Sequence, residues 1–331
     1  MRPIRVLRLA AAAAGIALAV SACGVTGDSD ESGGGALSDH RIMVPNSAGG
    51  GYDTTARTAA AAMEKEGIAK SIEVFNLEGA GGTVGLARIV NEEKNGKLAM
   101  LMGLGVVGAS YTNDTDASLS DTTPLARLIE EPGAVMVPKS SPYQTIDDLV
   151  TAWKADPGKV TVGGGSSPGG PDHLLPMQLA DAVGIDPKQV NFVQYDGGGD
   201  LLPAILGNKL EFATSGPSEF LDQIKSGELR VLATTGEERL DTLPDVPTLK
   251  ESGIDLLFTN WRGMVAPPGI SDSDRDAWID ALEEMHDSAA WEKALKDNGW
   301  TDAFITGDDF GTFMEEQDQR VVDVLSQLGL A

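Results

Sequence analysis

One stretch near the start of the chain decides the fold: Val44-Pro45-Asn46-Ser47-Ala48-Gly49-Gly50-Gly51-Tyr52-Asp53-Thr54-Thr55-Ala56-Arg57. Residues Arg41–Val44 before it predict a strand, and Asp53–Glu66 predict a helix that ends at Gly67. The glycines between strand and helix let the backbone approach a ligand, and the first N–H groups of a helix have no partner inside it. Such a turn can bind an anion. A capped helix start with nothing bound is the simpler interpretation of a single turn.

A second turn of the same kind follows. Asn76-Leu77-Glu78-Gly79-Ala80-Gly81-Gly82-Thr83-Val84-Gly85 lies between a predicted strand, Ile72–Phe75, and a predicted helix, Val84–Lys94. In an open parallel sheet both loops emerge at the carboxyl ends of the strands, where ligands bind. Two turns rich in N–H groups, side by side, suit a carboxylate better than one.

The rest of the chain continues the alternation of strands and helices, which predicts α/β domains with largely parallel sheets. A length of 331 residues, 41% of them hydrophobic, suggests two domains. Residues 103–133 are predicted to be rich in loops. The C-terminal third of the chain is predicted to be helical. Further strands are expected at Leu98–Met102, Ala134–Val137, Val160–Val162, Val190–Gln194, Leu210–Ala213 and Arg230–Ala233.

The charge of the chain argues against one class of partner, and the N-terminal residues indicate where the protein is located. Acidic residues outnumber basic ones 50 to 25, which argues against nucleic acid as a partner. Three arginines and an apolar run, Leu9–Val20, precede Cys23, the only cysteine. This pattern resembles a bacterial lipoprotein signal, so we expect a signal peptide over 1–22, lipidation of Cys23 and a flexible tether over 23–39. A free cysteine after an ordinary signal peptide is the alternative.

The two turns also carry a family resemblance. Pro45, Gly49, Gly50 and Asp53 match the P-x-x-x-G-G-x-x-D pattern of the tripartite tricarboxylate transporter substrate-binding family, the Bug receptors, and the second turn resembles that family's N-x-x-G-A-G-G-x-x-G. Later blocks follow in the same order; they are Asp172-His173-Leu174, Tyr195-Asp196-Gly197-Gly198, Gly227–Ala233, Glu238-Arg239, Val246–Gly253, Trp261-Arg262-Gly263 and Ala266-Pro267. The departures at Asn46, Ser47 and Gly170 bear on the identity of the ligand rather than on the class.

The resemblance implies a type II periplasmic-binding-protein fold, with two lobes joined by a two-stranded hinge. We place the first lobe at 40–137 plus 261–331 and the second at 138–260. The implied function is that of an extracytoplasmic receptor that captures a small di- or tricarboxylate, citrate-like as Tyr52 suggests. It delivers this ligand to a transporter with one large and one small integral membrane subunit. We expect a monomer on the outer face of the cell membrane, without catalysis.

The implied ligand contacts come from both lobes. In the first lobe the candidate donors are Ser47, Gly49, Gly50, Gly51, Gly81, Gly82 and Thr83, with Asp53 capping its helix. In the second lobe they are Ser166, Ser167 and Gly169 in a glycine-rich loop, His173, Tyr195, Gly197, Thr214 and Ser215. For His173, packing beside its helix start is the favoured interpretation.

Two other function classes stay open. Gly165-Ser166-Ser167-Pro168-Gly169 spells the nucleophile turn of an α/β serine hydrolase, but Pro168 lacks the N–H that would have to serve the oxyanion. Gly103-Leu104-Gly105-Val106-Val107-Gly108 spells a dinucleotide-binding pattern without a convincing helix after it. The three histidines, His40, His173 and His286, lack metal-ligand spacing, so no metal and no cofactor are expected. A carboxylate receptor that serves a sensor kinase is the nearer alternative.

Overall fold

The computed structural model describes residues 37–113, 115–195 and 197–329. The predicted signal peptide, Cys23 and nearly all of the tether lie outside these residues. No helix in the described ranges combines the length and the apolar character needed to cross a membrane.

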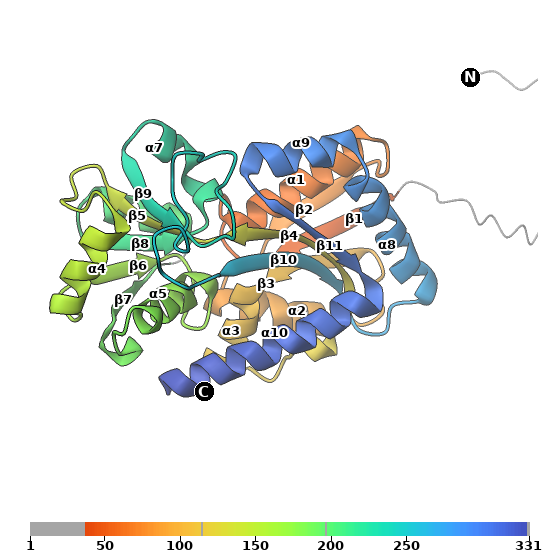
Figure 1. The fold of residues 1–331 in the computed structure, drawn as a ribbon. Helices are drawn as coiled ribbons and strands as arrows, with labels where there is room; N and C mark the ends of the chain where they lie inside the picture. Colours follow the sequence, from red (N-terminus) through yellow and green to blue (C-terminus); the bar gives the residue numbers. More distant parts are fainter. Residues whose placement is uncertain (1–36, 114, 196, 330–331) are drawn as a thin grey trace, which may run out of the picture. The chain divides into compact units, whose positions relative to one another are not determined.

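The first of two sheets has six strands in the order β11-β4-β10-β3-β1-β2 (Figure 1). Its strands are β1 (His40–Val44), β2 (Ile72–Asn76), β3 (Leu98–Gly103), β4 (Thr123–Pro132), β10 (Thr259–Ala266) and β11 (Thr301–Thr306). β1 pairs in parallel with β2 and β3, so the two glycine turns after β1 and β2 leave the same edge of the sheet. β10 is antiparallel to both β3 and β4.

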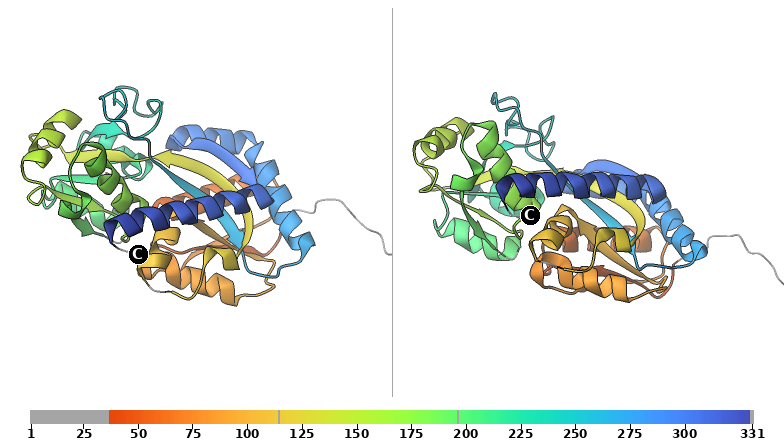
Figure 2. Two further views of the ribbon diagram at one scale, coloured as in Figure 1. Left: turned by 60° about the horizontal axis from the view of Figure 1, so that its bottom comes forward. Right: turned by 90° about the horizontal axis from the view of Figure 1, so that it is seen from below.

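Helices cover this sheet and close its core. They are α1 (Gly51–Lys65), α2 (Thr83–Asn91), α3 (Leu104–Thr112), α8 (Asp272–His286), α9 (Ala289–Asn298) and α10 (Gly307–Leu328), with short 3₁₀ turns η1 (Ala80–Gly82) and η2 (Leu119–Asp121). Trp261, Trp278 and Trp291 are fully buried here. Figure 2 shows α10 running along the first lobe, and its last turns line a hollow together with α5 of the second lobe.

The second sheet has five strands in the order β7-β6-β8-β5-β9. Its strands are β5 (Ala134–Pro138), β6 (Thr161–Gly164), β7 (Asn191–Gln194), β8 (Phe212–Ser215) and β9 (Leu229–Thr234). Its helices are α4 (Ile146–Ala155), α5 (Pro171–Ala182), α6 (Gly198–Leu206) and α7 (Leu221–Lys225), with 3₁₀ turns η3 (Pro187–Gln189) and η4 (Pro217–Phe220). Its core lies in two layers, around Trp153 on one face and Phe220 on the other.

Each sheet receives one antiparallel strand that follows a crossing between lobes: β5 in the second sheet and β10 in the first. This arrangement is the type II binding-protein fold that the sequence predicts. The first crossing lies at Gly133, before β5, because residues 134–137 pair within the second sheet. This is earlier than the boundary expected at Val137-Pro138. We therefore propose lobes of 40–132 plus 259–329 and of 134–258.

The two crossing segments are joined by the side chain of Thr235. Its hydroxyl accepts a hydrogen bond from the Gly133 amide at 2.7 Å and donates one to the Phe258 carbonyl at 2.5 Å. Thr235 itself is fully buried. One hydroxyl thus connects both strands of the hinge.

Four elements differ from the expected pattern. Residues 104–112 form helix α3, although the polar residues from Ala109 onward argue against it. β4, β10 and β11 are strands in segments read as loop or helix. β10 and β4 run beside each other along most of their lengths, so the core of the first lobe depends on two of the four elements that the pattern missed.

Candidate ligand-binding site

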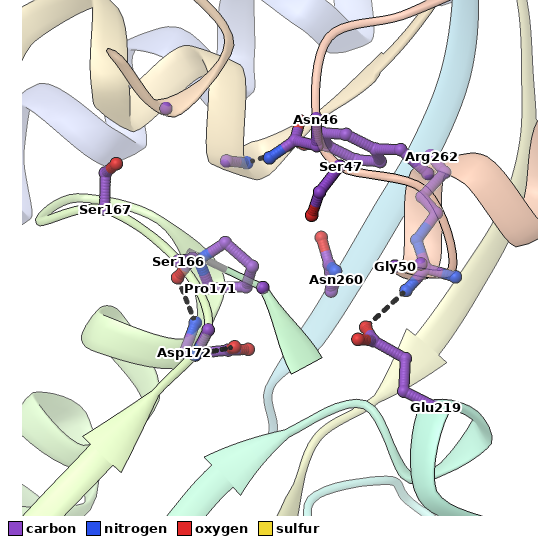
Figure 3. A pocket seen from close by; sticks show the side chains of 16 residues that line it. Asn46, Ser47, Gly50, Ser166, Ser167, Pro171, Asp172, Glu219, Asn260 and Arg262 are labelled. Carbon is purple, nitrogen blue, oxygen red and sulfur yellow. Dashed lines mark hydrogen bonds and ion pairs between the residues drawn. The ribbon is translucent and has the colours of Figure 1, made fainter. Parts of the chain in front are cut away.

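A cavity lies between the two lobes, at the carboxyl ends of the parallel strands (Figure 3). The first lobe contributes the turn before α1, Gly81 and Gly105, and the second contributes the loop after β6. Seven residues expected at the site line it; they are Ser47, Gly50, Gly51, Gly81, Ser166, Ser167 and Gly197. The other nine expected residues do not line it; they are Gly49, Asp53, Gly82, Thr83, Gly169, His173, Tyr195, Thr214 and Ser215.

Asp53 holds the first glycine turn in shape. Its carboxylate accepts hydrogen bonds from the Gly49 amide at 2.9 Å, from Arg57 at 2.9 Å and from Asn76 at 3.0 Å. Burial alone would raise the pKa of Asp53, but these bonds outweigh it and the pKa is lowered. Asn76 also donates to the Asn46 carbonyl, which connects the two turns. Asp53 therefore orients the loop rather than touching the cavity.

The amide of Gly50 is one donor that this arrangement leaves available. Gly50 precedes the first residue of α1, with φ −78° and ψ 174°. The Gly49 amide is bonded to Asp53, the Gly82 amide to the Gly79 carbonyl, and the Thr83 amide to Ala80. For the Gly50 amide no acceptor is found in the described part of the chain. It thus combines an unpaired N–H with the positive end of a 15-residue helix.

The second glycine turn needs its glycines for clearance. Gly79, Gly81 and Gly82 have φ values of 140°, 65° and 100°, in the region that residues with a side chain rarely adopt. A Cβ on Gly81 would lie 2.5 Å from the Ser167 hydroxyl oxygen of the second lobe. The turn therefore meets the opposite lobe at the mouth of the cavity.

In the second lobe, Asp172 organises the loop after β6. Its carboxylate accepts hydrogen bonds from the Gly165 amide at 2.7 Å and from the Ser215 hydroxyl at 3.2 Å. Its own amide donates to the Ser166 hydroxyl, and its carbonyl accepts from Thr214. Burial raises the pKa of Asp172 to about 7, against these bonds. Thr214 and Ser215 therefore support Asp172, which itself lines the cavity.

His173 packs beside its helix start, as favoured from the sequence. Its Nδ1 accepts a hydrogen bond from the Gly169 amide at 3.1 Å, and its ring packs edge-on against Phe192. Burial lowers the pKa of His173 to about 4, so the ring is neutral at pH 7. Tyr195 packs against the hydrophobic cluster around Phe220.

Sequence reasoning missed a charged group on the cavity wall. Arg262 of β10 is 1% exposed and pairs with Glu131 of β4 at 2.7 Å, while Glu219 of η4 lies 3.9 Å away from it. Asn260 also lines the cavity (Figure 3). Arg262 stands in the Trp-Arg-Gly block, which could have drawn attention to it. Nothing in the local sequence marks Glu131 or Glu219.

Glu219 lies in a largely buried environment, whereas glutamate side chains are usually exposed. Burial raises its pKa to about 8, and the neighbouring Asp172 adds to the rise, whereas Arg262 opposes it. The Gly51 amide lies beside Glu219 and lowers the pKa.

The lobes touch at the rim of the cavity. A Cβ on Gly108 of α3 would lie 1.9 Å from the carbonyl oxygen of Gly169, and Thr112 donates a hydrogen bond to the Pro168 carbonyl at 2.9 Å. Gly105 lies against the Tyr52 hydroxyl, which accepts a hydrogen bond from the Gly105 amide. The glycines of the dinucleotide-like pattern therefore leave space for these close contacts. The two lobes are closed upon each other.

The cavity differs from the hydrolase and metal sites weighed from the sequence. Pro168 follows Ser167, so the hydrolase turn lacks its oxyanion donor, and the Nδ1 of His173 is engaged by a backbone amide. Among the described residues there is no cluster of three or more His, Cys, Asp or Glu side chains that could hold a metal. What remains is an amide donor, several hydroxyls and a buried charged group.

Comparisons with known proteins agree with the fold. Residues 55–330 match the model of the tripartite tricarboxylate transporter family receptor. The chain is 30% identical over 289 residues to the UPF0065 protein in the TAR-I ttuE-ttuC' intergenic region of Agrobacterium vitis, a match that covers 86% of this chain and 79% of that protein.

Two solved structures show the same fold. MatC from Rhodopseudomonas palustris with bound malate matches with a TM-score of 0.76 at 23% identity, over 87% of this chain and 99% of that one. Rpa4515 of R. palustris with adipate matches with a TM-score of 0.80 at 21% identity, over 88% and 97%. The chain thus belongs to the tripartite tricarboxylate transporter family of solute-binding receptors, a family of receptors rather than enzymes.

Proposed function

We propose that this protein is an extracytoplasmic receptor, lipid-anchored through Cys23, that captures a small carboxylate between its lobes. It then presents the ligand to the large and small membrane subunits of a tripartite tricarboxylate transporter. The family match supports the receptor role. The carboxylate is supported by the malate and adipate held by two proteins of the same fold. The sequence resemblance extends this class to di- and tricarboxylates.

The observation that carries the proposal is Gly50 at the N-terminus of α1, which lines the cavity and whose amide has no protein acceptor in the described ranges. Micromolar affinity needs about 8 kcal/mol. Charge-assisted hydrogen bonds contribute roughly 1.5–3 kcal/mol each. A few such bonds, from the Gly50 amide and from hydroxyls such as Ser166 and Ser167, reach that value after ordering costs.

The mechanism is closure of two lobes on the ligand. Only a ligand that contacts both lobes favours the closed arrangement over an open one. The turn at Gly50 belongs to the first lobe and the loop at Ser166 to the second, so a carboxylate between them contacts both lobes. The hydroxyl of Thr235 joins both crossing strands at the hinge.

A single substitution tests the site. Gly50→Pro removes the amide hydrogen, whereas the φ of −78° is already close to the value of about −65° that proline requires. Gly50→Ala is the matched control, because its Cβ would meet only the Ser47 carbonyl, at 3.6 Å. Both variants keep the Gly50 carbonyl that accepts from Thr54.

The readout is thermal stabilisation and calorimetric titration with a panel of mono-, di- and tricarboxylates. We expect Gly50→Ala to bind like the unmodified protein, and Gly50→Pro to lose at least about tenfold in affinity while its unfolding temperature without ligand stays similar. Undiminished binding by a folded Gly50→Pro protein would contradict the proposed site. No stabilisation by any carboxylate would contradict the function.

A further inference from the structure

The charge balance on the cavity wall is unusual for a receptor of anions. Arg262 is the only cationic side chain among the described cavity-lining residues, and Asp172 and Glu219 line the same cavity. Glu131 lies directly behind Arg262. With all four groups ionised, one positive charge faces three negative ones, a formal balance of 1 − 3 = −2.

Arg262 does not offset this excess, because Glu131 already neutralises it. The two side chains are each 1% exposed and lie 2.7 Å apart. The other oxygen of Glu131 accepts the Ser218 amide at 3.0 Å, so this carboxylate is fully engaged. Glu219 lies 3.9 Å from Arg262 and shares that single guanidinium with Glu131. One guanidinium therefore serves two carboxylates, and Asp172 adds a third acidic group to the same cavity.

One donor in the group has no partner. The Nε of Arg262 is buried, and no acceptor for it is found in the described ranges. Because this Nε is buried inside the wall, we assign the Gly50 amide rather than Arg262 as the donor for a ligand carboxylate. The wall thus offers a donor for a carboxylate and, next to it, acceptors for a positive group.

The two halves of this arrangement meet at the first residue of α1. A Cβ on Gly51 would lie 2.3 Å from Arg262 and 2.9 Å from Glu219, so both side chains press against the residue that follows Gly50. In Figure 3 the two side chains face each other at this corner of the cavity. A ligand carboxylate at Gly50 therefore has Glu219 as a close neighbour, and a group bonded to the adjacent ligand carbon reaches it.

From this arrangement we propose that the preferred ligand carries an ammonium group on the carbon next to its carboxylate, so that it is an amino acid rather than a plain di- or tricarboxylate. Its carboxylate binds at the Gly50 amide, and its ammonium group donates to Glu219, with Asp172 contributing negative potential. Glu219 is the specificity-determining residue. The inference rests on the proposed function, because it assumes that the same cavity binds a carboxylate.

Matched ligands test the proposal. We would titrate the protein with pairs that differ only in one substituent: alanine and lactate, aspartate and malate, glutamate and 2-hydroxyglutarate. We expect the amino member of the best-bound pair to bind at least about tenfold more tightly, the range expected for one charge-assisted hydrogen bond. Equal or tighter binding of the hydroxy acids overturns the inference but leaves the proposed function intact. Binding of neither series contradicts both.

Variants assign the preference to Glu219. Glu219→Gln keeps the shape of the side chain, so we expect it to abolish the preference for amino over hydroxy acids while hydroxy acids bind as well as before or better. Glu316→Gln, an exposed position on α10, makes the same change in net charge and should leave the preference unchanged. An unchanged preference in folded Glu219→Gln overturns the assignment.

The pH dependence gives an independent readout. Glu219 faces Gly51 of α1, Arg262 of β10, Glu131 of β4 and Gly198 of α6, and burial raises its pKa to about 8; that of Asp172 is raised to about 7. An ammonium ligand favours their ionised forms, so binding should release protons and tighten from pH 6 to pH 8. Proton uptake, with weaker binding as pH rises, overturns the inference.

Discussion

Substituting Gly108 by alanine should separate ligand binding from folding stability. Gly108 lies inside α3, and the ideal Cβ of an alanine there would be 1.9 Å from the carbonyl oxygen of Gly169 and 2.1 Å from its carbonyl carbon. Both are backbone atoms of the opposite lobe, which cannot swing aside. Because real Cβ contacts are essentially never shorter than 3.0 Å, the lobes must separate there by at least 3.0 − 1.9 = 1.1 Å.

That separation also removes the neighbouring hydrogen bond from Thr112 to the Pro168 carbonyl, which measures 2.9 Å in the closed arrangement. We expect ligand affinity to fall at least tenfold, about 1.4 kcal/mol. Folding stability should not fall with it, since alanine is favoured over glycine inside a helix by about 1 kcal/mol. The two effects therefore have opposite signs.

The assay combines calorimetric titration, using the tightest ligand of the carboxylate panel, with urea unfolding of the ligand-free protein. Gly199→Ala is the matched control, because Gly199 also lies in a helix, α6, and nothing is within 4 Å of its added Cβ. If Gly108→Ala binds as tightly as Gly199→Ala, closure does not depend on this contact and the reasoning fails.

Two further predictions concern the hinge and the first glycine turn. Thr235→Val leaves the Gly133 amide and the Phe258 carbonyl unpaired, so it should lower the free energy of unfolding by about 1–3 kcal/mol for each of these groups. Thr235→Ser keeps the hydroxyl and should not lower it. Equal urea midpoints for the two variants would contradict this. Asp53→Asn should lower the free energy of unfolding by about 1–3 kcal/mol at pH 7. Because the pKa of Asp53 is lowered on folding, its contribution is present above its unfolded pKa of about 3.9 and disappears as pH falls through the native value. A difference between Asp53→Asn and the unmodified protein that stays constant from pH 6 to pH 3 would contradict the network around this carboxylate.

The sequence predicted the parallel parts of both sheets because their strands and helices alternate cleanly and their turns are marked by glycine. It did not predict β4 and β10. Residues 123–132 contain Arg127, Glu130 and Glu131, and residues 259–266 contain Arg262, so neither reads as an apolar strand. The structure explains these charges, since Arg262 and Glu131 neutralise each other across neighbouring strands.

The position of the site was predictable and its chemistry was not. A strand, a glycine turn and a helix place amide groups at one edge of the sheet whatever the side chains are. Which amides remain available depends on Asp53, Asp172 and His173, whose carboxylates and ring accept N–H groups of nearby loops. Glu219 reaches the cavity from a different part of the chain, and only the tertiary structure brings it to Arg262.

The place of β10 has a consequence for the order in which the lobes mature during synthesis. β10, residues 259–266, lies between β3 and β4, so the sheet of the first lobe is split until the ribosome has passed residue 266. The second lobe, by contrast, is one uninterrupted segment that has left the ribosome earlier. We therefore expect the lobe that is encoded second to be the first to acquire its native packing, with the N-terminal segment waiting for its missing central strand.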